Sequence, residues 1–200
     1  DLMTRLLGPD VQAVFDPAAD SSVLPVVLAA NPTATADALF LNRFAQFFTT
    51  LQARILSSEL NSLDGMSMPP ASTVSYLHCI SAPPFGGQVK IRSGQRSRQP
   101  AVLAIDEMVR RLAPGGRAVV LVGENLLFSS GSASAIRRQL LDQGLLSAVI
   151  SLPVGVFRYA GIKTSVLLLE NKQAGNSDVV FVDAGEYLTT NSPRHKVIDG

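Results

Sequence analysis

The sequence predicts an α/β domain in which helices cover both faces of a mainly parallel β-sheet. Short apolar runs alternate along the chain with amphipathic stretches, which is the pattern of strands joined by helices. The chain has 200 residues, of which 46% are hydrophobic and 16% charged, so it is long enough to bury one sizeable core. No internal repeat interrupts the pattern. We therefore expect residues 1–200 to form a single domain.

Five elements are expected before residue 85, and proline positions help to place them. Pro25 is tolerated in a helix only within the first turn, so the helix around it should begin close to that residue. Pro83 and Pro84 should end the apolar run before them as a strand, since a residue that precedes proline is driven out of the helical region. The expected strands are residues 11–16, 38–41 and 74–81, and the expected helices are residues 21–30 and 44–60.

The second half of the chain is expected to contain two helices and four strands. Residues 113–116, Ala-Pro-Gly-Gly, read as a turn between a helix and a buried strand. The expected helices are residues 101–112 and 132–143, and the expected strands are residues 117–122, 145–152, 164–170 and 179–182. Because no helix separates the last two strands, we expect them to pair antiparallel at the edge of a seven-stranded sheet.

Charge, cysteine content and hydropathy limit the classes of function. The net charge of +1 gives no global attraction to nucleic acid, so any contact with DNA must come from a local patch. The single cysteine, Cys79, excludes an internal disulfide, and neither it nor the two histidines have the spacing of metal ligands. The sequence shows no signal-peptide layout and no run of eighteen apolar residues. We expect a cytoplasmic protein without a membrane or metal partner, and a fragment of a longer chain because residue 1 is not Met.

A series of motifs in the second half resembles a known enzyme family. From residue 115 the chain contains GGRAVVLV, then LLFSSG, AIRRQLL, AVISLPVGVF and GIKTS, in that order. This order is similar to that in the amino (N6) adenine-specific DNA methyltransferases, specifically the M subunits of type I restriction-modification systems. The resemblance implies a Rossmann-like S-adenosylmethionine-dependent methyltransferase fold.

The resemblance extends back to a degenerate catalytic motif. The family has Asn-Pro-Pro-Phe where this chain has Ala82, Pro83, Pro84 and Phe85. In the family the Asn accepts a hydrogen bond from the adenine amino group, the prolines keep the arm rigid, and the aromatic ring stacks on a flipped-out base. Ala82 offers no acceptor. The alternative is a purely structural role, in which the prolines only end a strand and Phe85 packs in the core.

The cofactor motifs of the family are degenerate as well. The stretch DPAADSSVL begins at Asp16, where the family has Asp-Pro-Ala and then a glycine-rich loop. The glycine positions align with Asp20 and with Ser22 or Val23, where a side chain would obstruct close approach of the backbone to the cofactor. Arg43 aligns with an acidic residue that binds the ribose hydroxyls. Asp16 keeps its place, and we expect it to cap the following turn.

Two segments are candidates for contact with DNA. Residues 90–98 hold four cations with no acid between them, although a solvated loop is the commoner outcome for such a run. The segment that ends in GIKTS helps the family to hold the extruded base, although ordinary packing would also explain its aromatic residues. The candidate DNA-binding residues are Lys90, Arg92, Arg96, Arg98, Phe157, Tyr159 and Lys163.

Together, these positions indicate one site that has lost several of the family's catalytic and cofactor-binding groups, while the apolar residues of the fold are kept. We predict a methyltransferase-like domain that does not transfer methyl groups, has no cofactor, and serves as a DNA-binding or scaffolding subunit of a restriction-modification-like complex. One alternative is an active adenine-specific DNA methyltransferase that uses S-adenosylmethionine. Another is a protein-interaction module without a role on nucleic acid.

Overall fold

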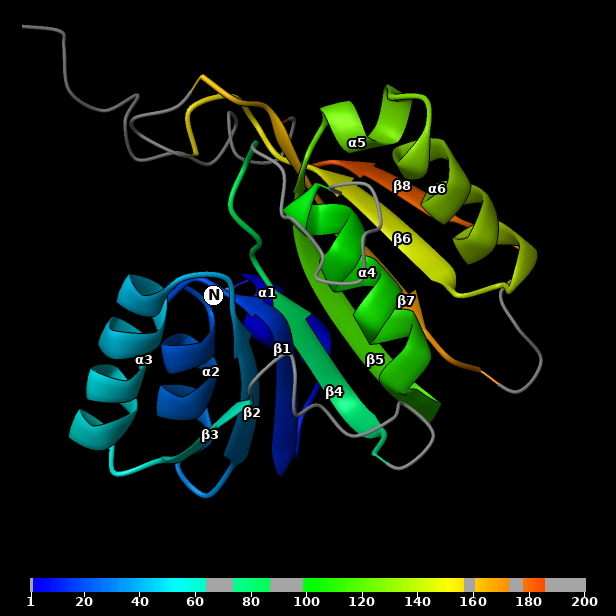
Figure 1. The fold of residues 1–200 in the computed structure, drawn as a ribbon. Helices are drawn as coiled ribbons and strands as arrows, with labels where there is room; N and C mark the ends of the chain where they lie inside the picture. Colours follow the sequence, from blue (N-terminus) through cyan, green and yellow to red (C-terminus); the bar gives the residue numbers. More distant parts are fainter. Residues whose placement is uncertain (1, 64–73, 87–98, 157–160, 173–177, 186–200) are drawn as a thin grey trace, which may run out of the picture.

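The computed structural model describes residues 2–63, 74–86, 99–156, 161–172 and 178–185. Eight strands form one sheet in the order β3-β2-β1-β4-β5-β7-β6-β8 (Figure 1). In chain order the elements are α1 (Leu2–Leu7), β1 (Ala13–Ala19), α2 (Leu24–Ala30), β2 (Thr35–Phe40), α3 (Arg43–Ile55), β3 (Glu59–Leu63), β4 (Tyr76–Ser81), α4 (Pro100–Arg111), β5 (Leu112–Gly123), α5 (Asn125–Phe128), α6 (Ser132–Asp142), β6 (Leu146–Ser151), β7 (Thr164–Glu170) and β8 (Val180–Asp183).

The parallel part of the sheet reverses its direction of growth between β1 and β4. Strands β3, β2, β1, β4 and β5 pair parallel with their neighbours. From β1 the chain builds outward through β2 to β3, and it then returns to place β4 and β5 on the other side of β1. Ligands of open α/β sheets bind beyond the carboxyl ends of the strands at such a reversal. The fold therefore directs attention to the carboxyl ends of β1 and β4.

The expected antiparallel hairpin is present, but different strands form it. Strand β7 pairs antiparallel with both β5 and β6, whereas β8 pairs parallel with β6. The prediction that the last two strands pair with each other was wrong. Both edges of β7 are taken by β5 and β6, so β8 cannot pair with β7 and joins the outer edge of β6 instead.

Two further expectations about element boundaries were wrong. Helix α3 ends at Ile55, because Ser57 adopts a left-handed φ of 55° and the chain then enters β3, the additional eighth strand. Strand β5 begins at Leu112 and includes the residues expected to form a turn. The backbone of Gly115 donates to the carbonyl of Asn171 at 2.7 Å, which continues the pairing of β5 beyond the end of β7.

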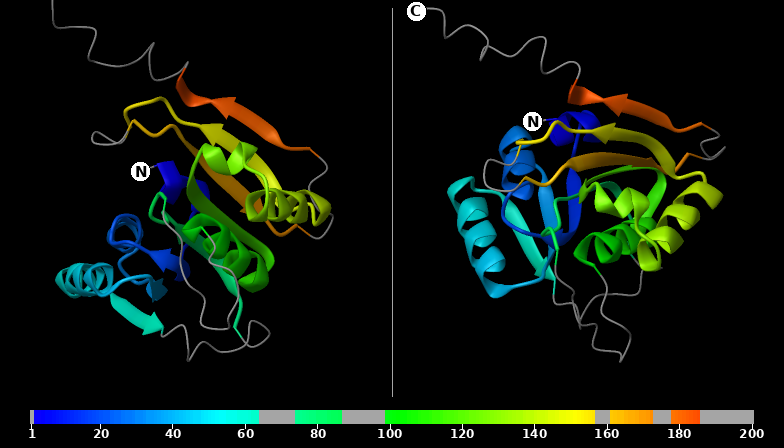
Figure 2. Two further views of the ribbon diagram at one scale, coloured as in Figure 1. Left: turned by 45° about the horizontal axis from the view of Figure 1, so that its top comes forward. Right: turned by 90° about the horizontal axis from the view of Figure 1, so that it is seen from above.

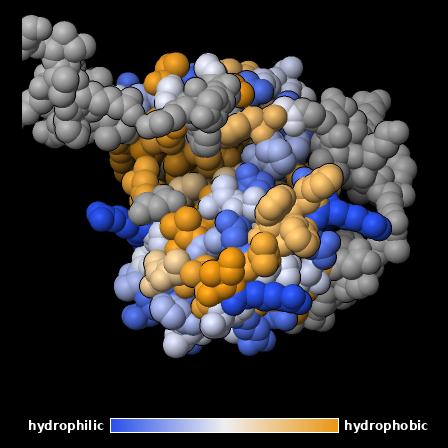
Figure 3. All heavy atoms as spheres, turned by 90° about the vertical axis from the view of Figure 1, so that its left-hand side faces the viewer, coloured by the Kyte–Doolittle hydropathy of each residue, from blue (hydrophilic) through white to orange (hydrophobic). Residues whose placement is uncertain are grey.

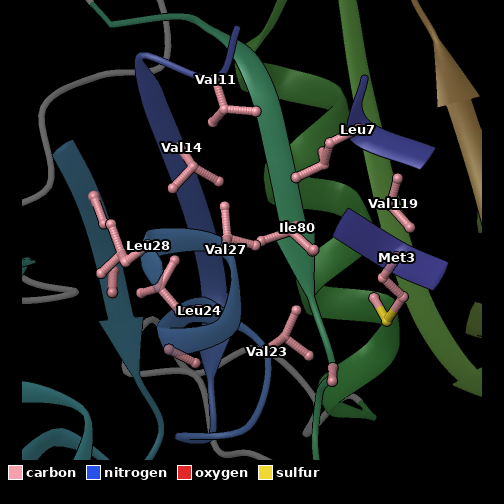
Figure 4. Packing of buried hydrophobic residues seen from close by; sticks show 14 of the residues in the cluster. Met3, Leu7, Val11, Val14, Val23, Leu24, Val27, Leu28, Ile80 and Val119 are labelled. Carbon is pink, nitrogen blue, oxygen red and sulfur yellow. The ribbon is translucent and has the colours of Figure 1, made fainter. Parts of the chain in front are cut away.

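Helices cover both faces of the sheet, and each face buries its own apolar cluster (Figure 2). Successive residues of β1 alternate between them, with Val14 in the first cluster and Phe15 in the second. In the first cluster, Val14 and Ile80 lie beside Val27 of α2 and near Leu7 of α1 (Figure 4). Within the described ranges, no helix has the length and apolar character needed to cross a bilayer.

Candidate functional site

The structure brings the predicted cofactor and catalytic positions to one edge of the sheet. The carboxyl end of β1 leads to Asp20 and Ser22, that of β2 leads to Arg43, and that of β4 leads to Ala82 and Phe85. These three strands are adjacent and parallel, so their carboxyl ends lie side by side (Figure 1). This is the edge at which the sheet reverses its order.

A buried hydrogen bond joins β1 to β4 at the centre of this edge. Ser81 Oγ donates to Asp16 Oδ1 at 2.6 Å, and the backbone N–H of Ala18 donates to the same oxygen at 3.0 Å. The register of β1 against β2 shifts between Asp16 and Ala19, around Pro17, which has no N–H of its own. Asp16 was expected to cap the turn after the first strand, but β1 continues to Ala19, so the contact with Ala18 lies within the strand. Through Ser81, Asp16 also ties β1 to β4.

Burial sets the ionisation of Asp16, whose exposed fraction is 1%. Loss of hydration is the largest cause that raises the pKa of Asp16, and the hydrogen bonds from Ser81 and Ala18 act in the opposite direction. Together with a smaller raising effect of the nearby Asp20, these causes bring the pKa to about 7. The carboxyl group at the centre of the edge thus gains or loses its charge near neutral pH.

Replacing Asp16 by Asn is expected to stabilise the fold most at alkaline pH. The folded pKa of about 7 exceeds the ordinary value of 3.8. The contribution of Asp16 to the stability of the native chain is therefore fully present below pH 3.8 and is lost as the pH rises through 7. Asn keeps the oxygen acceptor and carries no charge. We expect the stability advantage of D16N, measured by urea unfolding, to grow by about 2–3 kcal/mol between about pH 5 and about pH 8.

The matched control is Asp142→Asn, which changes an exposed carboxylate on α6. Its stability difference from the native chain should stay nearly constant over the same pH range. A flat difference for D16N as well would show that Asp16 stays ionised without cost in the folded chain.

The loop after β1 is closed by its own side chains. The carboxylate of Asp20 accepts the backbone N–H of Ser22 at 2.9 Å and also its hydroxyl. Ser21, between them, adopts a φ of 78°, in the left-handed region that favours glycine. In a glycine-rich loop the backbone would be open to a ligand here, whereas in this chain a carboxylate occupies the turn.

At the end of β2, a cap and a cation stand where the resemblance predicts an acid. Asn42 Oδ1 accepts the N–H of Ala45 at 2.8 Å and so caps α3. Arg43 is the first residue of α3, is exposed, and lines a groove on that helix together with Arg54. The sequence holds no Asp or Glu between Asp37 and Glu59, so no carboxylate of this segment can take the predicted role.

The Pro-Pro segment places its aromatic ring between the core and an open hollow. Ala82 is 6% exposed and belongs to the first apolar cluster, against which one side of Phe85 also packs. The ring of Phe85 lies beside Gly123. A side-chain Cβ at Gly123 would be in van der Waals contact with Phe85 Cδ1, at 3.8 Å. A hollow of about 510 Å³ opens next to the ring. Phe85 thus packs against the core, as the purely structural alternative predicts, and it also lines a space that is open to a ligand.

Lys163 lies at the same edge of the sheet but is already paired. Its Nζ is 2.8 Å from Oε1 of Glu124, and the backbone N–H of Glu124 donates to the carbonyl of Lys163 at 2.9 Å. The hydrogen bond and charge of Glu124 raise the pKa of Lys163. A phosphate would therefore have to compete with this carboxylate for the lysine. The other six candidate DNA-binding residues lie outside the described residues: Lys90, Arg92, Arg96, Arg98, Phe157 and Tyr159.

Sequence reasoning missed three polar residues of this edge. Ser81 holds Asp16, and Glu124 and Asn125 line the hollow beside Phe85. Each follows or ends a buried strand at its carboxyl end, which was the available signal, because polar residues at that place of a parallel sheet tend to face the ligand crevice.

Comparison with known families agrees with the fold and with the motif order. Residues 87–198, more than half of the chain, match the model of the family described as N-6 DNA Methylase. The chain belongs to the N-6 DNA methylase family. The match begins after Phe85, so it includes none of the degenerate positions at the ends of β1, β2 and β4.

Curated relatives of this chain are methylase subunits of type I restriction enzymes, as the motif order predicted. The EcoKI methylase subunit of Escherichia coli strain K12 is 32% identical over 117 residues, which are 56% of this chain and 21% of the relative. The StySJI methylase subunit of Salmonella typhimurium is 34% identical over 108 residues, which are 52% of this chain and 20% of the relative. The matched stretch spans about a fifth of the length of these relatives.

Solved structures show the same fold. The type I restriction-modification methyltransferase subunit from Streptococcus thermophilus aligns with a TM-score of 0.74 at 20% identity, over 92% of this chain and 46% of that chain. A putative class I S-adenosylmethionine-dependent methyltransferase from Listeria monocytogenes aligns with a TM-score of 0.69 at 15% identity, over 94% of this chain and 65% of that chain. The predicted methyltransferase fold is thereby confirmed.

Proposed function

We propose that this N-6 DNA methylase domain does not transfer methyl groups and serves as a DNA-binding or scaffolding subunit of a restriction-modification-like complex. One observation carries the proposal. Three adjacent strand ends meet at the edge where the family binds its cofactor and target base, and each presents a group unsuited to that task. Such a complex acts on DNA, which would place the chain in the cytoplasm.

The ends of β1 and β2 do not fit S-adenosylmethionine. The carboxylate of Asp20 fills the turn after β1, where it would repel the carboxylate of the cofactor's methionine moiety. Ser22 adds a side chain where backbone should approach the ligand. Arg43 donates hydrogen bonds and accepts none, and its side chain lines a groove on α3. No carboxylate in this segment is available to hold the ribose hydroxyls.

The end of β4 does not fit the target adenine. Transfer to the amino nitrogen needs an acceptor that orients the amino group toward the methyl donor. Ala82 supplies only a methyl group, and that methyl group is packed in the first apolar cluster. Phe85 keeps one partly open face beside the hollow, so stacking of a base would remain compatible with the loss of transfer.

An active methyltransferase is the second candidate, and two observations favour it. The chain belongs to a family of DNA methylases, and the hollow beside Phe85 has an aromatic wall on which a base could stack. A partner subunit would then have to supply both the acceptor and the cofactor contacts that this edge lacks. One of the similar solved structures concerns complex assembly of the type I restriction-modification system, so a partner subunit is consistent with both candidates.

Isothermal titration of the chain with S-adenosylmethionine is expected to give no saturable binding up to about 1 mM. Transfer of labelled methyl groups to adenine-containing duplex DNA should likewise stay at background. The EcoKI methylase subunit is the matched positive control for both measurements. Saturable binding at micromolar concentration would contradict the proposal for the cofactor site and favour the active enzyme.

A further inference from the structure

Helix α3 turns its large apolar side chains away from the protein. Its buried residues are the small Ala45, Thr49 and Ala53. Its large apolar residues are exposed, at 79% for Phe44, 63% for Phe47, 52% for Phe48, 45% for Leu51 and 74% for Ile55. Their spacing of three, four and seven residues places them along one face of the helix, which we name the α3 stripe. This amphipathic helix therefore uses its small side chains for the core and leaves an apolar face unpartnered.

The α3 stripe is an apolar surface with a hollow of mixed polar and apolar lining beside it. A hollow of about 580 Å³ lies along one side of it, lined by Phe47 and Leu51 together with the polar Arg43, Gln46, Thr50 and Arg54. The rings of Phe47 and Phe48 meet edge to face with centroids 5.5 Å apart. Figure 3 shows the side of the molecule on which α3 lies, with hydrophobic and hydrophilic side chains interleaved. Exposed aromatic and arginine side chains of this kind are enriched at the centres of protein interfaces.

The charged side chains of α3 itself have one sign. No Asp or Glu occurs between Asp37 and Glu59, so the helix carries two arginines and no acid to balance them. Complementary charges across an interface select the right partner and its orientation. A complementary partner would therefore present apolar side chains at helical spacing, with carboxylates on both sides of them.

We propose that the α3 stripe is the docking surface for an amphipathic helix of another protein subunit. The apolar face of that helix packs on Phe47, Phe48 and Leu51, and its flanking Asp or Glu side chains pair with Arg43 and Arg54. This is the helix-in-groove mode of recognition, with anchors at helical spacing. Apart from Arg43, which starts α3 at the end of β2, the docking surface lies along α3 and away from the ends of β1 and β4. The tests of docking therefore use Phe47, Leu51 and Arg54, none of which belongs to the candidate cofactor site.

Two other occupants fit the surface less well. A second copy of the chain would offer another α3 with arginines and no acids, so the charges of the two helices would not complement each other. A membrane surface binds amphipathic helices that are rich in Lys and Arg, whereas α3 has two arginines, and its opposite face is packed into the protein.

The test uses the chain and two labelled synthetic peptides of about 20 residues, long enough to form a helix. Both peptides carry Leu at helical spacing, and one has Glu at the flanking positions where the other has Lys. Fluorescence anisotropy should show micromolar binding of the Glu peptide and at least about tenfold weaker binding of the Lys peptide. The double variant Phe47→Ser and Leu51→Ser should weaken binding of the Glu peptide by about tenfold or more.

A matched control and a charge reversal distinguish specific docking from non-specific hydrophobic binding of the peptides. Leu141→Ser removes a 56% exposed apolar side chain at the end of α6 and should leave binding of the Glu peptide unchanged. Arg54→Glu should weaken the Glu peptide and strengthen the Lys peptide. Absence of binding by the Glu peptide at about 100 μM, or equal binding of both peptides, would overturn the proposal.

The remaining outcomes identify another occupant and also overturn the proposal. Light scattering that shows a dimer of the native chain, lost in the Phe47 and Leu51 variant, would assign the α3 stripe to a second copy. Binding to vesicles of phosphatidylcholine and phosphatidylserine that the same variant abolishes would assign it to a membrane surface. Unchanged melting temperatures of the variants show that the fold is kept in each comparison.

Discussion

Replacement of Phe15 by alanine is expected to lower the free energy of unfolding by about 3–5 kcal/mol. Phe15 has no exposed surface, and its ring stacks on that of Tyr76 with centroids 4.8 Å apart and an interplanar angle of 11°. The guanidinium of Arg111 lies 5.6 Å from the ring centroid on a helix that packs over β1. Truncation would therefore leave a cavity between the sheet and α4, where surrounding side chains cannot collapse freely.

Urea unfolding of the native chain and the variant measures this loss. Phe15→Leu should lose less, because it refills most of the volume while still removing the ring stack. The matched control is Phe128→Ala, which removes a ring that is 77% exposed and should change stability by at most about 0.5 kcal/mol. A loss for Phe15→Ala no larger than that of the control would mean that the second apolar cluster does not depend on this ring.

Burial explains which strands could be predicted from the sequence. The seven expected strands include β1, β4, β5 and β7, which are largely buried and therefore appear as short apolar runs. Strand β3 was missed because none of its residues is buried and because Glu59 to Leu63 directly follows a helical pattern. An edge strand with mostly exposed side chains leaves little hydrophobic signal.

The order of strands could not be obtained in the same way. The rule that adjacent strands with a short connection pair together failed for β7 and β8, because β7 inserts between β5 and β6. That insertion is decided by contacts of β7 with strands earlier in the chain, and the local sequence of residues 170–180 carries no trace of them. Local patterns predict elements, whereas pairing depends on which edges are still free.

The candidate site was predictable in position and less so in contacts. The motif residues met because carboxyl ends of parallel strands share an edge, which follows from strand direction alone. The bond between Asp16 and Ser81 joins residues 65 positions apart, and no local signal pairs them. The outward placement of Arg43 likewise depends on the cap made by Asn42, which starts α3 at that residue.

The triple variant Asp20→Gly, Ser22→Gly and Arg43→Glu is expected to bind S-adenosylmethionine at least about 100-fold more tightly than the native chain, a gain of about 2.7 kcal/mol. The first two changes remove the carboxylate that fills the turn after β1 and open the backbone to the ligand. The third supplies an acceptor for the ribose hydroxyls at the end of β2. Isothermal titration measures the affinity, and methyl transfer would additionally require Ala82→Asn.

Ser21→Gly is the matched control for this restoration, because it relieves the left-handed φ of 78° in the same turn while Asp20 and Arg43 stay in place. It should raise stability slightly without creating affinity for the cofactor. Equal gains in affinity from Ser21→Gly and from the triple variant would mean that backbone strain, and not the carboxylate or the missing ribose acceptor, keeps the cofactor out. No gain from the triple variant would place the obstacle elsewhere, since all three of the groups held responsible would then have been replaced at an otherwise intact edge of the sheet.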